Sequence, residues 1–263
     1  MTAMSGRSGP DAPAVPPSGP GHVESLAKGL RILAEFAGGE LLGNQQLCER
    51  TGLPRSTVSR LTSTLVELGY LRTAPESAKF LLGARLLGMG ARVQSRLGIP
   101  HVVRPLMQAL AQKTQATVCL AAPDRLAMVC LEVAAPSPGF AEAGSEFALD
   151  GSAMGLACLV AAPVGERMRL IQALHHRPMP DGQRLRGSIA AAHEEYQRHG
   201  LVSWVHGLSG QRFHEIALPV CLRESGGHFV LSCALPAAQA PMDYLRLVLG
   251  PELLQAVRWM RLS

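Results

Sequence analysis

The chain has 263 residues, enough for one large domain or two of ordinary size, and 47% of them are apolar, enough for a packed core. Its net charge of +5 permits binding to nucleic acid without requiring it. The sequence has no run of 18 apolar residues and no signal-peptide pattern, so we expect a cytoplasmic protein that does not enter a membrane.

Residues 1–22 are rich in Pro, Gly, Ser and Ala. Such a segment buries too little apolar surface to offset the entropy lost on ordering, so we expect a disordered tail. A helix is expected next, from Ser25 to Ala37, ended by Gly38 and Gly39. Its apolar side is predicted to consist of Val23, Leu26, Leu30, Leu33 and Phe36.

Residues 44–70 have the pattern of a helix, a tight turn and a second helix. Asn44 can cap the first helix, and Gly52 can close it in the left-handed conformation. Pro54 suits the first turn of the second helix, where its missing N–H costs nothing. The apolar side of that helix is predicted to be Val58, Leu61, Leu65 and Leu68.

The opposite side of the second helix is polar and carries no acid. It comprises Arg55, Ser56, Thr57, Ser59, Arg60, Thr62 and Ser63. Arginine can pair with guanine edges, and serine and threonine can bind phosphates or bases. This helix is therefore predicted to read a major groove, although a merely solvated polar face is the common alternative for any single helix.

Two short apolar runs between Tyr70 and Gly83 flank a polar turn, as in a β-hairpin. With three helices before it, this hairpin would complete a winged helix-turn-helix over residues 23–83. Ser77 and Lys79 at the tip of the wing, and Arg85 just after it, are predicted to contact DNA phosphates. The predicted DNA-binding set is Arg55, Ser56, Thr57, Ser59, Arg60, Ser63, Ser77, Lys79 and Arg85.

A linker helix is expected over residues 84–98. Its apolar stripe is Leu86, Met89, Val93 and Leu97. The stripe can pack on a second copy of the chain or within its own chain, and the pattern alone fits both.

Residues 99–263 are predicted to form an α+β domain with an antiparallel sheet, because strands and helices occur in groups. A helix at 101–115 precedes two strands at 117–122 and 126–133. Helices follow at 150–162, with Asp150 or Ser152 as cap, and at 164–175 and 188–199. Three strands at 201–206, 213–222 and 228–235, with a turn at Arg223–Gly227, precede a closing helix at 241–262. We interpret the six cysteines, none in a C-x-x-C pair, as reduced core residues.

Catalytic and metal patterns are weak. Ser25 and Lys28 match S-x-x-K without its partner motifs, and His193 and His199 lie on different faces of one helix. No catalytic residue, metal ligand or cofactor is therefore expected. An enzyme with a helical accessory domain stays open as the alternative to a ligand-responsive DNA-binding regulator.

The sequence resembles IclR-type transcriptional regulators over essentially all of residues 23–262. The matching segments are Ser25–Leu33, Thr51–Leu61, Phe80–Gly88, Asp150–Ala157, Ala217–Val220 and Leu231–Pro236. The resemblance implies a homodimer or homotetramer that binds double-stranded, pseudo-palindromic operator DNA. It also implies a small-molecule effector, often an organic acid. An organic acid or an aromatic metabolite is expected here.

The resemblance and helix physics together indicate an effector site. A helix start at Ser152, Ala153, Met154 and Gly155 offers free N–H groups to an anion. Ser232 on a core strand would face the pocket. Glu215 would stand at its rim, where the family often has a cysteine; the usual acidic cluster upstream is replaced by Ser203–Ser209. The alternatives stay open: an ordinary capped helix at Ser152, a strand hydroxyl bonded within the protein at Ser232, and a solvent-facing strand residue at Glu215. The low aromatic content, 4%, argues against an aromatic cage and for a small polar effector.

Overall fold

The computed structural model describes residues 22–96, 99, 101–137, 140–175, 182–208, 210–222 and 228–262. The predicted tail, apart from His22, and the predicted turn at Arg223–Gly227 lie outside these residues. The chain divides into two compact units, one ending at Leu97 and one beginning at Gly98. Each is described by itself.

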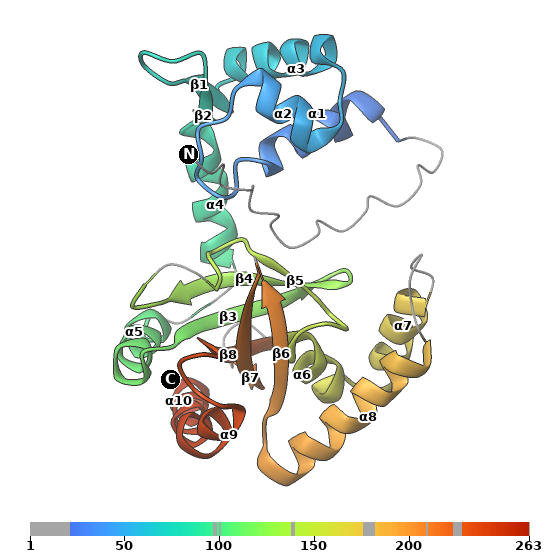
Figure 1. Ribbon diagram of the computed structural model, residues 1–263, viewed down its shortest axis with the longest axis vertical. Helices are drawn as coiled ribbons and strands as arrows, with labels where there is room; N and C mark the ends of the chain where they lie inside the picture. The colour runs from blue at the N-terminus through green and yellow to red at the C-terminus, as the bar shows by residue number, and fades with distance from the viewer. Residues whose placement is uncertain are drawn as a thin grey trace. The chain divides into compact units, whose positions relative to one another are not determined.

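The first unit is a winged helix-turn-helix, as predicted (Figure 1). Its elements are α1 (Glu24–Ala34), α2 (Asn44–Thr51), α3 (Arg55–Glu67), β1 (Leu71–Thr73), β2 (Phe80–Leu82) and α4 (Arg85–Arg96). β1 and β2 pair antiparallel, from Leu71 opposite Leu82 to Thr73 opposite Phe80. Gly52 ends α2 with φ 68°, the left-handed conformation expected of it.

Two predicted helix starts are shifted by one residue. Gly43, not Asn44, precedes α2, and the side chain of Gln46 accepts the Gly43 N–H at 3.1 Å. Pro54 stands at the cap position of α3 instead of in its first turn. Both residues still stabilise the start of their helix. Pro54 fixes its own φ, and Asn44 accepts a hydrogen bond from the Thr62 hydroxyl at 3.1 Å.

The predicted apolar side of α1 is wrong in part. The core of the unit receives Ile32 and Phe36, 0% and 1% exposed, whereas Val23, Leu26 and Leu30 are 57% to 62% exposed. Helix α1 is apolar on two sides, so its spacing alone did not decide which side is buried. Gly29 is buried, and a Cβ there would lie 3.9 Å from Leu61, so α3 packs on the Gly29–Ile32 side.

The second unit is built on one six-stranded antiparallel sheet, in the order β5-β4-β3-β8-β7-β6. The strands are β3 (Thr117–Asp124), β4 (Ala127–Ala134), β5 (Glu146–Ala148), β6 (Val202–Leu208), β7 (Gln211–Cys221) and β8 (His228–Pro236). The helices are α5 (Val103–Thr114), α6 (Ala153–Ala161), α7 (Val164–His175), α8 (Gly182–His199), α9 (Met242–Tyr244), the π-helix η1 (Leu245–Leu249) and α10 (Gly250–Leu262). The predicted α+β class with an antiparallel sheet is confirmed.

Helices cover both faces of this sheet (Figure 1). One core joins Val118, Leu120 and Ile216 to α5 and α10. The other joins the alternate strand residues, such as Ala121 and Ala217, to α6, α7 and α8. Because both faces are buried, the strands are nearly continuous apolar runs, which the sequence pattern could not assign to one face or the other.

The sequence missed three features of this unit. β5 has only three residues, too few to produce a strand pattern. α8 begins at Gly182, before the expected Ser188. The helix continues through Gly187, because a glycine inside a helix weakens it without ending it. The closing helix widens at η1, since Pro251 has no N–H to bond to the preceding turn. In the described part of the chain, no helix is long and apolar enough to span a bilayer.

Candidate DNA-binding and sensor sites

Helix α3 presents a basic polar face on an apolar back. Val58, Thr62 and Leu65 are buried against the rest of the unit. The exposed side chains are Arg55, Ser56, Ser59, Arg60 and Ser63, and Thr57 is half-buried. The structure therefore brings the six predicted residues of this helix onto its accessible side, where side chains of this kind can reach base edges and phosphates.

Thr62 does not belong to that polar face. It is 1% exposed, and its hydroxyl lies 3.1 Å from Asn44 Oδ1, 3.0 Å from the Val58 carbonyl and 3.1 Å from the Ser59 carbonyl. A buried threonine that hydrogen-bonds the preceding turn is compatible with a helix side facing the core. Thr62 thus connects α2 and α3, which fixes the angle of the helix-turn-helix.

The wing has an exposed polar tip. Between β1 and β2 the chain turns through Glu76, which has φ 63°. Ser77 and Lys79 on this turn are exposed, as is Arg85 at the start of α4. The Arg85 side chain also crosses Gly69, where a Cβ would lie 3.3 Å from its Cδ and Nε atoms. Arg85 is therefore placed by packing as well as by charge.

The start of α6 is an anion site that the protein fills itself. Of the two predicted caps, Asp150 and Ser152, it is Ser152 that caps the helix, its Oγ accepting the Gly155 N–H at 2.9 Å. The Ala153 N–H donates to Glu215 Oε2 at 2.8 Å, although Glu215 lies 62 residues further along the chain. The same oxygen lies 2.7 Å from His206 Nε2. Two of the N–H groups expected to receive an effector are thus taken by Ser152 and Glu215.

Glu215 is not at a rim, as the sequence indicated. It is 0% exposed, on the sheet face that α6 covers. Its Oε1 atom and the hydroxyl of Ser232, also 0% exposed, find no hydrogen-bond partner among the described residues. Polar atoms buried in this way usually have a partner, so this pair is an exception that asks for an explanation.

Gly155 is needed for packing, which removes it from the predicted pocket lining. A Cβ at this position would lie 2.2 Å from the carbonyl oxygen of Leu149. Met154 is also buried, at 0% exposed, among apolar neighbours. The backbone at Gly155 therefore packs directly against the backbone at Leu149, and this leaves no space for a ligand at Gly155.

Aromatic rings cluster beside His206. The ring centroids of Phe140 and Phe147 are 5.1 Å apart, and those of Phe140 and Phe213 are 5.3 Å apart. His206 meets Phe140 and Phe147 edge-on, at 5.3 and 5.6 Å. Three of the six phenylalanines of the chain thus gather next to Glu215, which a low overall aromatic content could not reveal.

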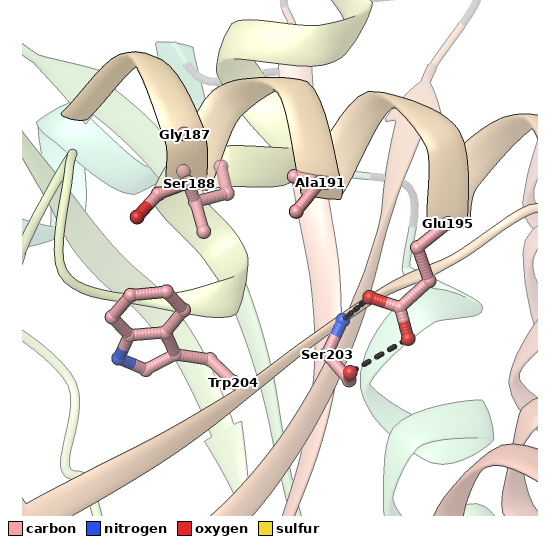
Figure 2. A pocket seen from close by; sticks show the side chains of 8 residues that line it. Gly187, Ser188, Ala191, Glu195, Ser203 and Trp204 are labelled. Carbon is pink, nitrogen blue, oxygen red and sulfur yellow. Dashed lines mark hydrogen bonds between the residues drawn. The ribbon is translucent and has the colours of Figure 1, made fainter. Parts of the chain in front are cut away.

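A cavity of about 410 Å³ lies where α8 faces β6 and α6 (Figure 2). It is lined by Leu156, Gly187, Ser188, Ala191, Ala192, Glu195, Ser203 and Trp204. Figure 2 shows the indole of Trp204 opposite the small residues of α8. Trp204 is the register partner of Glu215, so the cavity and the buried glutamate share neighbouring strands.

Glu195 closes one end of this cavity as part of a polar network that the sequence did not reveal. It accepts the Ser203 N–H at 2.9 Å and the Ser203 hydroxyl at 2.6 Å (Figure 2). Arg246 of η1 donates to Glu195 at 2.9 Å and to Ser203 at 2.7 Å. These partners are far apart in sequence, so no local motif could have indicated them.

The cysteines are mostly core residues, as expected. Four are buried, Cys48 is half-buried, and Cys221 is exposed at the end of β7, which contradicts a core position for that one. Burial raises the pKa of Cys158 to about 11. The neighbouring Cys130 and burial raise the pKa of Cys119 well above its usual value. These thiols stay protonated and unreactive at neutral pH.

The fold and the α3 surface define a transcriptional regulator: a winged helix-turn-helix with a basic face, followed by an α+β domain. The IclR helix-turn-helix domain matches residues 25–75. The HTH-type transcriptional regulator TsaQ1/TsaQ2 of Comamonas testosteroni is 44% identical over 247 residues, 92% of this chain and 88% of that protein. The chain therefore belongs to the IclR family.

Solved structures agree with this assignment. An IclR family transcriptional regulator from Brucella abortus is 35% identical, with a TM-score of 0.67 over 91% of this chain and 92% of that one. An IclR homologue from Microbacterium hydrocarbonoxydans, complexed with 4-hydroxybenzoate, is 23% identical and shares the fold, with a TM-score of 0.65 over 91% and 100%. The relatives named here are regulators, and nothing in these comparisons supports the alternative of an enzyme.

Proposed function

We propose that this regulator binds a pseudo-palindromic operator through α3 and the wing, and that a small molecule in the second unit changes its affinity for DNA. The exposed Arg and Ser face of α3 carries the first part. Arg55 and Arg60 are exposed while Val58 and Leu65 hold the helix to its unit. Ser77, Lys79 and Arg85 would add phosphate contacts, as would the serines and Thr57 of α3.

The proposed working form is a homodimer, or a homotetramer built from two such dimers. Val23, Leu26 and Leu30 on α1, and Met89 and Val93 on α4, are all more than half exposed. Several exposed apolar side chains in one small unit are typical of a surface that another chain covers. A two-fold dimer would place two α3 helices on successive half-sites of a palindrome. We place this form in the cytoplasm, where a bacterial-type operator is found.

The proposed sensor lies at Glu215, Ser232 and the start of α6. Two observations support this position: the unpartnered buried atoms of Glu215 and Ser232, and the cavity of about 410 Å³ on the adjacent strand β6, where Trp204 lines it and is the register partner of Glu215. Such a volume is within the range of small-molecule pockets. Ala153 would hold Glu215 in place through its N–H, and Ser152 would hold the helix start in place by accepting the Gly155 N–H.

Operator binding tests the proposal. DNA from upstream of the chain's own gene should be shifted by the wild type, and the binding should weaken with salt. Arg55→Ala and Arg60→Ala should each weaken it by about 1–3 kcal/mol, because each arginine would lose a base contact. Arg186→Ala on α8 is the matched control, since Arg186 is exposed in the other unit. Full affinity in both α3 variants would show that another surface reads the DNA.

A further inference from the structure

The buried carboxylate at the start of α6 identifies the chemistry of the effector. We propose that Glu215 is a built-in occupant of an anion site, and that the sensor therefore takes an effector with a hydrogen-bond donor, a protonated amine above all, and rejects a carboxylate. This rests on the proposed sensor position and adds the class of ligand.

The helix start has an anion site because its N–H groups lack partners within the helix. The first turn of α6 contains no acid of its own. Glu215 supplies a carboxyl oxygen from β7 instead, with Oε2 at 2.8 Å from the Ala153 N–H. The place where a ligand carboxylate would bind is thus already filled by a protein carboxylate.

One oxygen of that carboxyl group makes no hydrogen bond to the described residues. Oε2 is used by Ala153 and His206, whereas Oε1 is buried without a partner in the described part of the chain. The Ser232 hydroxyl, two residues from the register partner of Glu215, is in the same condition. A buried carboxylate oxygen gains most from a donor, and a charged donor gives the strongest hydrogen bond.

A second carboxylate here would be unfavourable. Glu215 is 0% exposed and already has His206 Nε2 at 2.7 Å, so a ligand carboxylate would bring a second carboxyl group into one buried site, and carboxylates that share a site disfavour each other's charge. The rings of Phe140, Phe147 and Phe213 lie beside His206. These buried rings make the surroundings of the carboxyl group apolar, which favours an effector with an apolar body.

The first experiment tests the built-in occupant without DNA and without knowledge of the effector. Glu215→Ala should empty the anion site, so sodium acetate should raise the unfolding temperature of this variant above the value in sodium chloride of equal concentration. Wild type should show no such difference. Glu146→Ala, which removes an exposed glutamate of the same unit, is the control. Equal responses to acetate in all three proteins would overturn the proposal.

The second experiment tests the ligand class, and it uses a variant that keeps the shape of the site in case Glu215→Ala does not fold. Benzylamine and benzoate have similar size, but protonated benzylamine donates hydrogen bonds, whereas benzoate only accepts them. Wild type should bind benzylamine at least about tenfold more tightly by calorimetry, and Glu215→Gln should lose most of this preference, since the charge is gone. Wild type that prefers benzoate, or binds neither probe, contradicts the proposal. Both measurements are independent of operator binding, so a failed gel shift would be a separate result.

Discussion

At the scale of single residues, the second unit depends on close contacts between backbone atoms. Gly155 lies one turn into α6, where a Cβ would be 2.2 Å from the Leu149 carbonyl oxygen. The sequence predicted that this glycine lines a ligand pocket, where a larger side chain would only occupy the space of the ligand. In the structure the same substitution has to displace backbone instead.

Gly155→Ala should therefore destabilise the protein by more than about 2 kcal/mol, since an added methyl group forces the backbone apart. Urea unfolding measures this directly. Gly165→Ala is the matched control, because a Cβ at Gly165 on α7 meets nothing within 4 Å. The control should be neutral or stabilising by up to about 1 kcal/mol, as alanine favours helix. A Gly155→Ala protein as stable as wild type would show that Leu149 is not packed in this way.

At the scale of elements, helix α3 and the wing should contribute to DNA binding in different ways. The side chains of α3 face outward along one helix and can carry base contacts, whereas the wing offers Ser77 and Lys79 on an exposed turn. Contacts to phosphate position a protein without reading sequence. Loss of a wing contact should therefore affect operator and unrelated DNA alike.

For this reason Lys79→Ala should lower affinity for both kinds of DNA by a similar factor. The slope of log affinity against log salt should become shallower by about one unit, the value for one phosphate contact. Fluorescence anisotropy over a salt series gives both quantities. Lys113→Ala serves as control, because Lys113 pairs with Glu252 in the other unit. A change in sequence preference would mean that Lys79 reads a base.

At the scale of the whole molecule, the exposed apolar side chains of the first unit bear on assembly. Val93 is 59% and Met89 is 55% exposed on α4. A single exposed apolar residue is ordinary on a protein surface. Here, however, the same unit also exposes Val23, Leu26 and Leu30. A second copy of the chain is the partner that a palindromic operator requires.

Val93→Glu should weaken the dimer, because a charge would be buried at the interface without a partner. Sedimentation velocity should show a larger monomer fraction, and operator affinity should fall at least about tenfold, since a monomer holds one half-site. Val164→Glu, at an exposed valine of α7, should change neither. An unchanged mass and affinity for Val93→Glu would place the interface elsewhere.

The sequence by itself determined the winged helix-turn-helix and the antiparallel α+β unit, and it limited the cap of α6 to Asp150 or Ser152. These depend on local chemistry: Gly52 takes a positive φ, Ser152 accepts a nearby N–H, and apolar spacing distinguishes helix from strand. The exposure of Arg55 and Arg60 followed from the same spacing, since the opposite side of α3 had to be buried.

Only the tertiary structure decided which of two apolar sides α1 buries, that Thr62 faces the core, and that Glu215 caps a helix 62 residues before it. Each depends on a contact between distant segments. The spacing of a helix shows that it has an apolar side, but the neighbour that covers it comes from the fold. The charge of Glu215 likewise gave no hint of its partner, because the strand that carries it and the helix it binds meet only when the sheet forms.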